Sequence, residues 1–554
     1  MALIYNFSIV AHIKLKPCLL TRMRQRNVWM IKSDYCKYFN ELSDITRGLS
    51  SIKKEVALLF LVLVCFLLLI NNSWKASPDS ALYLELGESI AHGAGYRFNG
   101  EEHTYVPPGF PLLVSLGVKV FGKSFLVYRV MMSLLGITTG FIGYVLIFRL
   151  LGRDMAFLIG GLFALNNTLL LNSSYITSDV LFTMVGLLSL LVVGSLRVES
   201  LDIKVLVLAG LLTGAPALVR VNGWGLPVSS GLFLYSSLKR DSPLKRISLA
   251  LFFVILGFVI PLMWEIHKMG YSPSYNEGEY IRAVTGRTLG TQLSIILNAA
   301  WGYVSETATA LAGVSIKTGF VEVVIMAFVA LGFLAAWKRG ERLFTYLTVM
   351  QFGGLLLSPA GSRYLLLLIP GLLLFLFNGV IVTVVWLKSH ISFRGWKFPE
   401  LKGVILATSI MLFATNMGQN AVTISEARLA LESGGAETLK DQPFFVAARW
   451  LKANADGKSV LTMNPRIINY LSGLPTVEML RSGSPEETVL PKTVREIDGI
   501  IKKRRPAFLF LDNRDQFLKG LIIAAAQSQN YRVDVIHEAS CGNRYILARL
   551  SPVK

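Results

Sequence analysis

Long runs of apolar residues, separated by short polar stretches, recur over most of the first 420 positions of the chain. An α-helix needs about 20 apolar residues to cross a bilayer, and about eleven runs come close to that length. They lie at about residues 54–71, 125–151, 154–171, 176–197, 203–220, 222–238, 246–266, 318–337, 342–359, 363–388 and 401–418. The pattern predicts an α-helical polytopic membrane protein with about eleven transmembrane helices.

Two further runs do not fit this pattern cleanly. The run at about 107–122 is short and opens with Pro107-Pro108-Gly109, so we expect a re-entrant or interfacial segment there rather than a full span. The run at about 290–313 is ambiguous between a span and a surface helix.

The composition changes at about residue 421. Downstream, short apolar runs that are typical of strands alternate with stretches of helical spacing, which predicts a small α/β domain. No catalytic motif is found in this part of the chain. The sequence thus predicts a basic N-terminal segment at 1–50, a transmembrane catalytic domain at 51–420 and an α/β domain at 421–554.

Composition supports a membrane protein, because 53% of the residues are hydrophobic and only 16% are charged, against about 25% charged in soluble domains. The net charge of +20 resides mostly in short loops between apolar runs and forms no stripe interleaved with aromatic residues, so nucleic acid is not an expected partner. The four cysteines show no CxxC spacing, which argues against a cysteine zinc site. The segment 1–50 lacks the apolar core of a signal peptide and reads as a cytoplasmic extension, or as a start codon placed too early.

The distribution of charged residues predicts the orientation. Lys and Arg gather in the loops 239–246, 338–342 and 388–402, whereas the loop 72–106 carries five carboxylates and two basic residues. Because Lys and Arg favour the cytoplasmic side, we expect a cytoplasmic N-terminus and, after eleven spans, an extracytoplasmic α/β domain. The expected location is the inner (plasma) membrane.

The loop after the first run contains a recognisable helix. Ser77 is a suitable N-cap, with Pro78 and Asp79 in the first turn and Gly93 as a stop. Its apolar residues share one face, which predicts an amphipathic helix on the outer membrane surface. Asp79 would then lie close to the end of the first span.

Three further charges are expected at the same membrane face: Asp179, Arg220 and Arg363, the last followed by Tyr364. Charges at membrane depth are costly and usually face a cavity or a partner. Each one taken singly could equally cap a helix or extend to the interface. Together, however, two arginines and two carboxylates at similar depth predict a charged cavity on the extracytoplasmic side.

An ordered set of short motifs extends over about residues 55–380. It comprises Asp79 followed by Tyr83, then GAGYRF, HTYVPPGFPLL with His103, FGKSFLVYRV with Arg129, SDVLF with Asp179, LVRVNG with Arg220, and SRYLLLLIPGL with Arg363 and Tyr364. In this order and spacing the chain resembles the GT-C superfamily of membrane glycosyltransferases. That group includes the protein O-mannosyltransferases, the lipid A aminoarabinose transferase and related bacterial enzymes.

The resemblance implies a sugar transfer from a polyprenyl-phosphate donor to a lipid, glycan or protein acceptor, with inversion. It implies that Asp79 is the catalytic base and that Arg220 or Arg363 binds the departing phosphate. Asp179 would orient the acceptor or help to hold a divalent cation, the one cofactor that the pattern leaves open. Substrate binding is expected of Tyr83, His103 and Tyr364 as well.

The chain departs from the family pattern before Pro107. The aminoarabinose transferase has a Glu-Lys pair there, whereas this chain has Tyr105 and Val106, so a metal ligand and a phosphate-binding lysine are missing and His103 is a candidate to compensate. The alternatives are a membrane transporter or lipid flippase, and an envelope assembly protein or membrane polymerase. No internal repeat of the kind found in transporters is evident.

Overall fold

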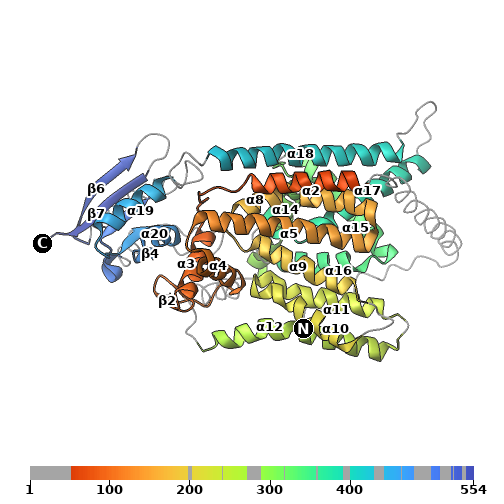
Figure 1. The fold of residues 1–554 in the computed structure, drawn as a ribbon, viewed down its shortest axis with the longest axis horizontal. Helices are drawn as coiled ribbons and strands as arrows, with labels where there is room; N and C mark the ends of the chain where they lie inside the picture. The colour runs from red at the N-terminus through yellow and green to blue at the C-terminus, as the bar shows by residue number, and fades with distance from the viewer. Residues whose placement is uncertain are drawn as a thin grey trace.

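A computed structural model describes residues 51–553, except 197–201, 240, 271–288, 317, 357–359, 391–399, 430–441, 463, 479–500, 512–525, 528 and 540–544. The predicted N-terminal segment 1–50 therefore lies outside the described residues. The described chain forms an elongated molecule in which a large helical bundle adjoins a small β-sheet domain (Figure 1).

The helical bundle follows the apolar runs of the sequence. Its elements are α2 (Ile52–Leu67), α3 (Pro78–Ala91), α4 (Gly109–Phe121), α5 (Phe125–Leu151), α6 (Arg153–Met155), the π-helical turn η2 (Ala156–Gly160), α7 (Gly161–Ala164), α8 (Asn167–Ser174), α9 (Asp179–Gly194), α10 (Ile203–Gly214), η4 (Ala215–Leu218), η5 (Val221–Trp224), α11 (Gly225–Ser237), α12 (Pro243–Lys268), α14 (Leu289–Ala312), α15 (Phe320–Arg339), α16 (Arg342–Leu355), η6 (Ser362–Leu365), α17 (Ile369–His390) and α18 (Leu401–Leu429).

Within the described residues, six helical stretches are long and apolar enough to cross a membrane. They are Phe125–Leu151, Arg153–Ser174, Pro243–Lys268, Phe320–Arg339, Ile369–Ser389 and Leu401–Leu429. Each of the other runs expected to span also contains a helix, but α2, α9, α10, α11 and α16 have between 12 and 16 residues. A polytopic helical protein is therefore confirmed, whereas the number of eleven spans is not.

The outer surface of α12 is apolar and exposed, as expected of a helix that faces lipid. Leu251, Ile255, Leu262 and Ile266 are 57%, 63%, 47% and 64% exposed, although α12 is one of the most apolar helices of the chain. A continuous apolar face of this kind is unfavourable in water and favourable in hydrocarbon.

Inside the bundle, small residues allow close helix packing. Gly332 on α15 lies against the backbone of Phe375 and Gly379 on α17, and Gly379 lies against the backbone of Phe328. A Cβ atom at either glycine would collide with main-chain atoms, so the two helices approach as closely as small-residue interfaces in membranes permit.

The two ambiguous runs both form helices. The run at 107–122 becomes α4, whose Val114 and Pro111 lie directly against Gly87 of α3. The run at 290–313 becomes α14, a helix of 24 residues. Beyond α3 the chain also makes a small hairpin of β1 (Arg97–Phe98) and β2 (Glu101–Glu102), turned by Asn99 and Gly100, both with positive φ.

The C-terminal part holds a five-stranded sheet in the order β4-β3-β5-β7-β6. The strands are β3 (Val460–Thr462), β4 (Thr476–Glu478), β5 (Phe508–Leu511), β6 (Tyr531–Ala539) and β7 (Tyr545–Pro552). Strand β3 runs parallel to β4 and β5, and the pairs β5–β7 and β6–β7 are antiparallel. Two helices accompany the sheet, α19 (Gln442–Asn454) and α20 (Pro465–Ser472).

Helix α20 attaches this sheet to the helical bundle beside α3 (Figure 1). The Tyr470 hydroxyl donates to Glu88 Oε1 at 2.7 Å, and Asn469 Nδ2 donates to Asn99 Oδ1 at 2.9 Å. The ring of Tyr470 also packs edge-on against Trp74, with centroids 5.2 Å apart. The sheet domain is thereby held over the end of the bundle at which α3 begins.

Candidate active site

The start of α3 is fixed by local hydrogen bonds. Ser77 caps the helix in a reciprocal capping box with Ser80, and Pro78 occupies the first helical position, as the sequence predicts. The indole N–H of the buried Trp74 donates to Ser80 Oγ at 3.0 Å. Because both ends of this turn are held, the carboxylate of Asp79 has a defined position.

Two arginines from distant parts of the chain meet the Asp79 carboxylate. Arg363 Nη1, from η6, lies 3.2 Å from Asp79 Oδ2, and Arg466 Nη1, from α20, lies 3.7 Å from Oδ1. The Asp79 side chain is 41% exposed, so it remains accessible to a reactant. Asp79 is therefore both held by cations and open to a substrate.

A second, buried pair lies close to the first. Arg220 Nη1 is 2.9 Å from Asp179 Oδ1, and the Asp179 side chain is only 1% exposed. The same Nη1 lies 3.1 Å from Ser178 Oγ, which in turn is 2.8 Å from the hydroxyl of Tyr83. Burial raises the pKa of Tyr83 to about 12, so this phenol keeps its proton at neutral pH.

Tyr364 joins the two pairs. Arg363 Nη2 donates to the Tyr364 hydroxyl at 2.9 Å, and the guanidinium groups of Arg363 and Arg220 lie 4.9 Å and 5.2 Å from the centre of its ring. Six of the seven predicted site residues thus form one connected cluster with Ser178 and Arg466. We call this set the carboxylate–guanidinium network; its members are Asp79, Tyr83, Ser178, Asp179, Arg220, Arg363, Tyr364 and Arg466.

The charges of the network favour an anionic ligand. Three guanidinium groups face two carboxylates, which leaves a formal charge of +1. A guanidinium presents paired N–H donors that match phosphate or carboxylate oxygens. The network is therefore suited to a ligand that carries a phosphate group.

The same arrangement fits a divalent cation poorly. Each carboxylate of the network already contacts a guanidinium, whose positive charge repels a metal ion. Nowhere among the described residues do three or more His, Cys, Asp or Glu side chains gather as a potential metal site.

His103 does not join the network. Its backbone N–H donates to Tyr96 O at 2.9 Å, and its ring packs near Tyr96 and Phe98. Burial, together with the smaller effect of the Arg466 charge, lowers the pKa of His103 to about 4, so the imidazole is neutral at neutral pH. The structure thus gives no contact through which His103 would compensate for the missing Glu-Lys pair.

The sequence analysis missed two members of the network. Ser178 precedes Asp179 and has no signal beyond its position. Arg466 lies in the C-terminal part, where no catalytic motif is found; it follows Pro465 at the start of α20. Only the packing of α20 on α3 reveals its partner.

Arg129, a further residue of the motif set, is structural. It is 1% exposed, and its guanidinium donates to Ser73 O at 3.1 Å and to Ser174 O. Arg129 therefore ties the chain just before α3 to the end of α8, behind the network.

Glu85, one turn and a half beyond Asp79 on α3, gives a test of pH dependence. Its Oε1 accepts from Asn99 N at 2.6 Å. The pKa of Glu85 is raised to about 7, mainly by burial; the Asn99 N–H and Lys123 oppose this rise and the neighbouring Glu88 adds to it. Because the ordinary value is 4.5, the folded state holds a proton that the unfolded state has lost between about pH 4.5 and 7, and stability falls as pH rises through this window.

We therefore expect Glu85→Gln to gain thermal stability relative to the wild type as the pH is raised from 5 to 8. Melting curves of the purified proteins in nanodiscs at several pH values measure this difference. Glu426→Gln, which alters a half-exposed carboxylate, serves as the control and should show little change with pH. Parallel pH curves for Glu85→Gln and the wild type would contradict a raised pKa.

Solved structures with the same fold bind polyprenyl phosphates. ArnT from Cupriavidus metallidurans, solved with bound undecaprenyl phosphate, superposes with a TM-score of 0.54 at 15% identity, over 90% of this chain and 98% of ArnT. The oligosaccharyltransferase AglB from Archaeoglobus fulgidus, solved with an inhibitory peptide and a dolichol-phosphate, superposes with a TM-score of 0.52 at 12% identity, over 90% of this chain and 74% of AglB.

The amino-acid sequence itself matches known proteins over a shorter segment. Residues 105–264 match the family model described as dolichyl-phosphate-mannose-protein mannosyltransferase. An uncharacterized protein from Aquifex aeolicus is 31% identical over 139 residues, which is 24% of this chain. The match spans only 28% of that relative's length.

The comparisons show a shared fold over most of the chain and a family likeness over one segment of it. The chain has the GT-C fold of ArnT and AglB, and part of its helical bundle matches the mannosyltransferase family model. The resemblance drawn from the sequence motifs is thereby confirmed. The comparisons do not favour the alternative of a transporter or flippase.

Proposed function

We propose that this protein is an integral membrane glycosyltransferase that moves a sugar from a polyprenyl-phosphate carrier to an acceptor of the cell envelope. One observation carries the proposal: the exposed carboxylate of Asp79 is held at 3.2 Å from Arg363 within a network of net positive charge. Such a site offers a base for the acceptor and cations for the phosphate. ArnT was solved with undecaprenyl phosphate bound, which supports a donor of this chemical class.

Asp79 acts as the general base in this proposal. An acceptor hydroxyl oxygen forms a bond to the anomeric carbon, and its proton passes to Asp79. The bond between the anomeric carbon and the phosphate oxygen breaks, and the electron pair of that bond leaves with the polyprenyl phosphate. Attack opposite to the leaving group inverts the anomeric configuration, and a positioned carboxylate contributes about 10²–10⁴-fold to such a step.

The arginines stabilise the charge that develops on the leaving phosphate. Arg363 contacts Asp79 and is 39% exposed, so it can reach both the base and the phosphate. Arg220 is held by the buried Asp179, so that Asp179 acts as a positioning residue for Arg220. The same guanidinium donates to Ser178 Oγ, which is itself hydrogen-bonded to the Tyr83 hydroxyl.

The proposed topology follows the charge bias of the loops. The N-terminus is cytoplasmic, and the network and the C-terminal sheet domain lie on the extracytoplasmic side of the inner membrane. The contacts of α20 with α3 support a location of the sheet domain on the same side as the site. The acceptor is a lipid, a glycan or a protein, and surrounding membrane lipid contacts the apolar faces of the bundle.

The test of the function compares envelope lipids and glycans, by mass spectrometry, between a strain that lacks this protein and its parent. We expect the loss of one specific sugar from one envelope component, restored by the wild-type chain and not by Asp79→Asn. Identical envelope spectra in the presence and absence of the protein, under conditions in which it is expressed, would refute a transferase function.

Arg466 leads to a separate prediction, because it enters the site from the C-terminal sheet domain. Its side chain is 22% exposed and lies 3.7 Å from Asp79. A hydrogen bond to a charged group contributes about 1.5–3 kcal/mol, so we expect Arg466→Ala to raise the KM for the polyprenyl-phosphate donor by about 10- to 100-fold.

Steady-state transfer assays with the purified full chain measure this effect. Arg532→Ala is the matched control, because Arg532 belongs to the same domain but is 75% exposed on β6, where it contacts only Asp534 among the described residues. Equal donor KM values for Arg466→Ala and Arg532→Ala would remove Arg466 from donor binding.

A further inference from the structure

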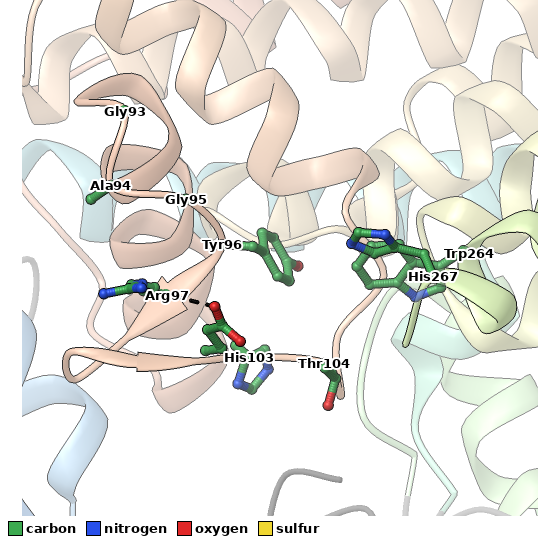
Figure 2. A pocket seen from close by; sticks show the side chains of 10 residues that line it. Gly93, Ala94, Gly95, Tyr96, Arg97, His103, Thr104, Trp264 and His267 are labelled. Carbon is green, nitrogen blue, oxygen red and sulfur yellow. Dashed lines mark ion pairs between the residues drawn. The ribbon is translucent and has the colours of Figure 1, made fainter. Parts of the chain in front are cut away.

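A hollow of about 230 Å³ opens between the β1–β2 hairpin and the end of α12 (Figure 2). It is lined by Gly93, Ala94, Gly95, Tyr96, Arg97, Glu102, His103, Thr104, Trp264 and His267. None of the residues assigned above to the base or the phosphate is part of its wall.

Two polar atoms of this wall lack a partner. Trp264 Nε1 and His103 Nε2 are both buried, and neither has a hydrogen-bond partner in the described part of the chain. An indole N–H is a donor only, whereas a ring nitrogen of a neutral imidazole donates or accepts according to the tautomer. Leaving a buried polar group unsatisfied costs about 1–3 kcal/mol. A ligand that forms hydrogen bonds with Trp264 Nε1 and His103 Nε2 would therefore gain binding free energy from each of them.

Three aromatic rings form part of the wall, those of Tyr96, Trp264 and His267. The rings of Tyr96 and Trp264 meet edge to face with centroids 5.7 Å apart, and His267 stacks on Trp264 at 5.5 Å. The Tyr96 hydroxyl is already used, because it donates to Val106 O at 2.9 Å. Figure 2 shows Tyr96 between His103 on one side and Trp264 with His267 on the other.

The rim adds two charged groups. Arg97 Nη2 and Glu102 Oε1 lie 3.8 Å apart and are 50% and 54% exposed. Together the wall and the rim offer apolar ring surfaces, an unused donor, an unused imidazole nitrogen and a charged pair. A pyranose ring has the complementary chemistry, because its C–H groups form apolar patches and its hydroxyls both donate and accept.

We propose that this hollow binds a sugar ring of one of the two reactants, with a ring hydroxyl accepting from Trp264 Nε1 and another hydroxyl contacting His103 Nε2. The inference rests on the proposed glycosyltransferase function and adds to it a binding site for the sugar. The two possible sources of the ring are the donor sugar and a sugar of the acceptor.

Two series of contacts connect the hollow to the network. Arg466, which contacts Asp79, also lowers the pKa of His103 through its charge. On the other side, Tyr83 of the network packs against Phe110 with ring centroids 5.1 Å apart. Phe110 lies just beyond Pro107, whose carbonyl is 3.4 Å from the Tyr96 hydroxyl.

The experiment measures binding without catalysis. Saturation-transfer difference NMR on the full chain in nanodiscs, free of sugar-based detergent, uses methyl α-mannopyranoside, methyl β-glucopyranoside and methyl β-galactopyranoside as probes. Glycerol is the control for hydroxyls without a ring, and N-acetylserinamide is the control for a peptide acceptor. We expect saturable binding of at least one methyl glycoside and of neither control.

Variants of Trp264 assign the binding to the hollow. Trp264→Phe keeps a ring and removes the N–H donor, so we expect about 3- to 10-fold weaker binding, in line with the loss of about one hydrogen bond; Trp264→Ala should abolish it. Trp301→Phe is the matched control, since Trp301 is 65% exposed on α14. Melting temperatures within a few degrees of the wild type verify folding of each variant.

Three results would overturn the inference: no saturable glycoside binding by the folded wild type, equal binding by Trp264→Ala, or binding of N-acetylserinamide in place of the glycosides. In transfer assays, a Trp264→Phe effect confined to the donor KM assigns the ring to the donor, and an effect confined to the acceptor KM assigns it to the acceptor. Trp264-dependent glycoside binding by a protein that transfers no sugar would refute the proposed function while the hollow remains a sugar site.

Discussion

Asp79→Asn is expected to lower the rate of sugar transfer by at least about 100-fold, because the amide cannot take the proton of the acceptor hydroxyl. The substitution keeps the shape of the side chain and the cap of α3, in which the Ser77 and Ser80 side chains take part. The loss should therefore fall on kcat rather than on folding. A transfer assay with purified wild type and variant, together with melting curves, measures both quantities.

The matched control for Asp79→Asn is Glu426→Gln. Glu426 also pairs with a cation, Lys75, at 3.5 Å, but it is 50% exposed on α18 and contacts no member of the network in the described structure. It should leave transfer unchanged. If Asp79→Asn retained the transfer rate within a factor of a few, Asp79 would not be the general base, and another group would have to take the proton of the acceptor hydroxyl.

Arg220→Met is expected to destabilise the folded protein by about 3–5 kcal/mol, because it leaves the buried carboxylate of Asp179 without its guanidinium. Asp179 is 1% exposed and Arg220 is 17% exposed, so water replaces the lost partner poorly. The double variant Asp179→Asn/Arg220→Met removes both charges, and it should recover most of the lost stability. Denaturation of the three proteins in nanodiscs measures these differences.

The rate of sugar transfer by the double variant distinguishes a structural role of the Asp179–Arg220 pair from a functional one. We expect the double variant to fold and yet to transfer sugar poorly, because the phosphate has lost one of its guanidinium groups. Arg153→Met is the control for a paired arginine at the surface, since Arg153 and Glu55 are 44% and 26% exposed; its cost should be at most about 1 kcal/mol. A double variant with normal transfer would exclude Arg220 from phosphate binding.

The helices and strands differ in how well the local sequence predicts them. The helix at Pro78–Ala91 was predicted with its cap, its proline and its first-turn aspartate, because caps and apolar spacing act over three or four residues. The β1–β2 hairpin was missed despite its Asn99-Gly100 turn, since strands of two residues leave almost no alternating pattern. Strands β4 and β7 were missed as well, and no short motif marks either of them.

From the sequence alone, a helical membrane protein could be predicted, and Asp79, Asp179, Arg220 and Arg363 could be expected close together, because apolar runs, helix caps and charge bias are patterns of neighbouring positions. The sequence did not determine the pairs. Asp79 meets Arg363 across 284 positions of the chain, and Arg466 arrives from a separate domain. The hollow at Trp264 and the isolation of His103 from the carboxylates likewise depend on how distant elements pack. Only the tertiary structure could decide these points, because contacts between distant segments leave no periodic trace in the sequence.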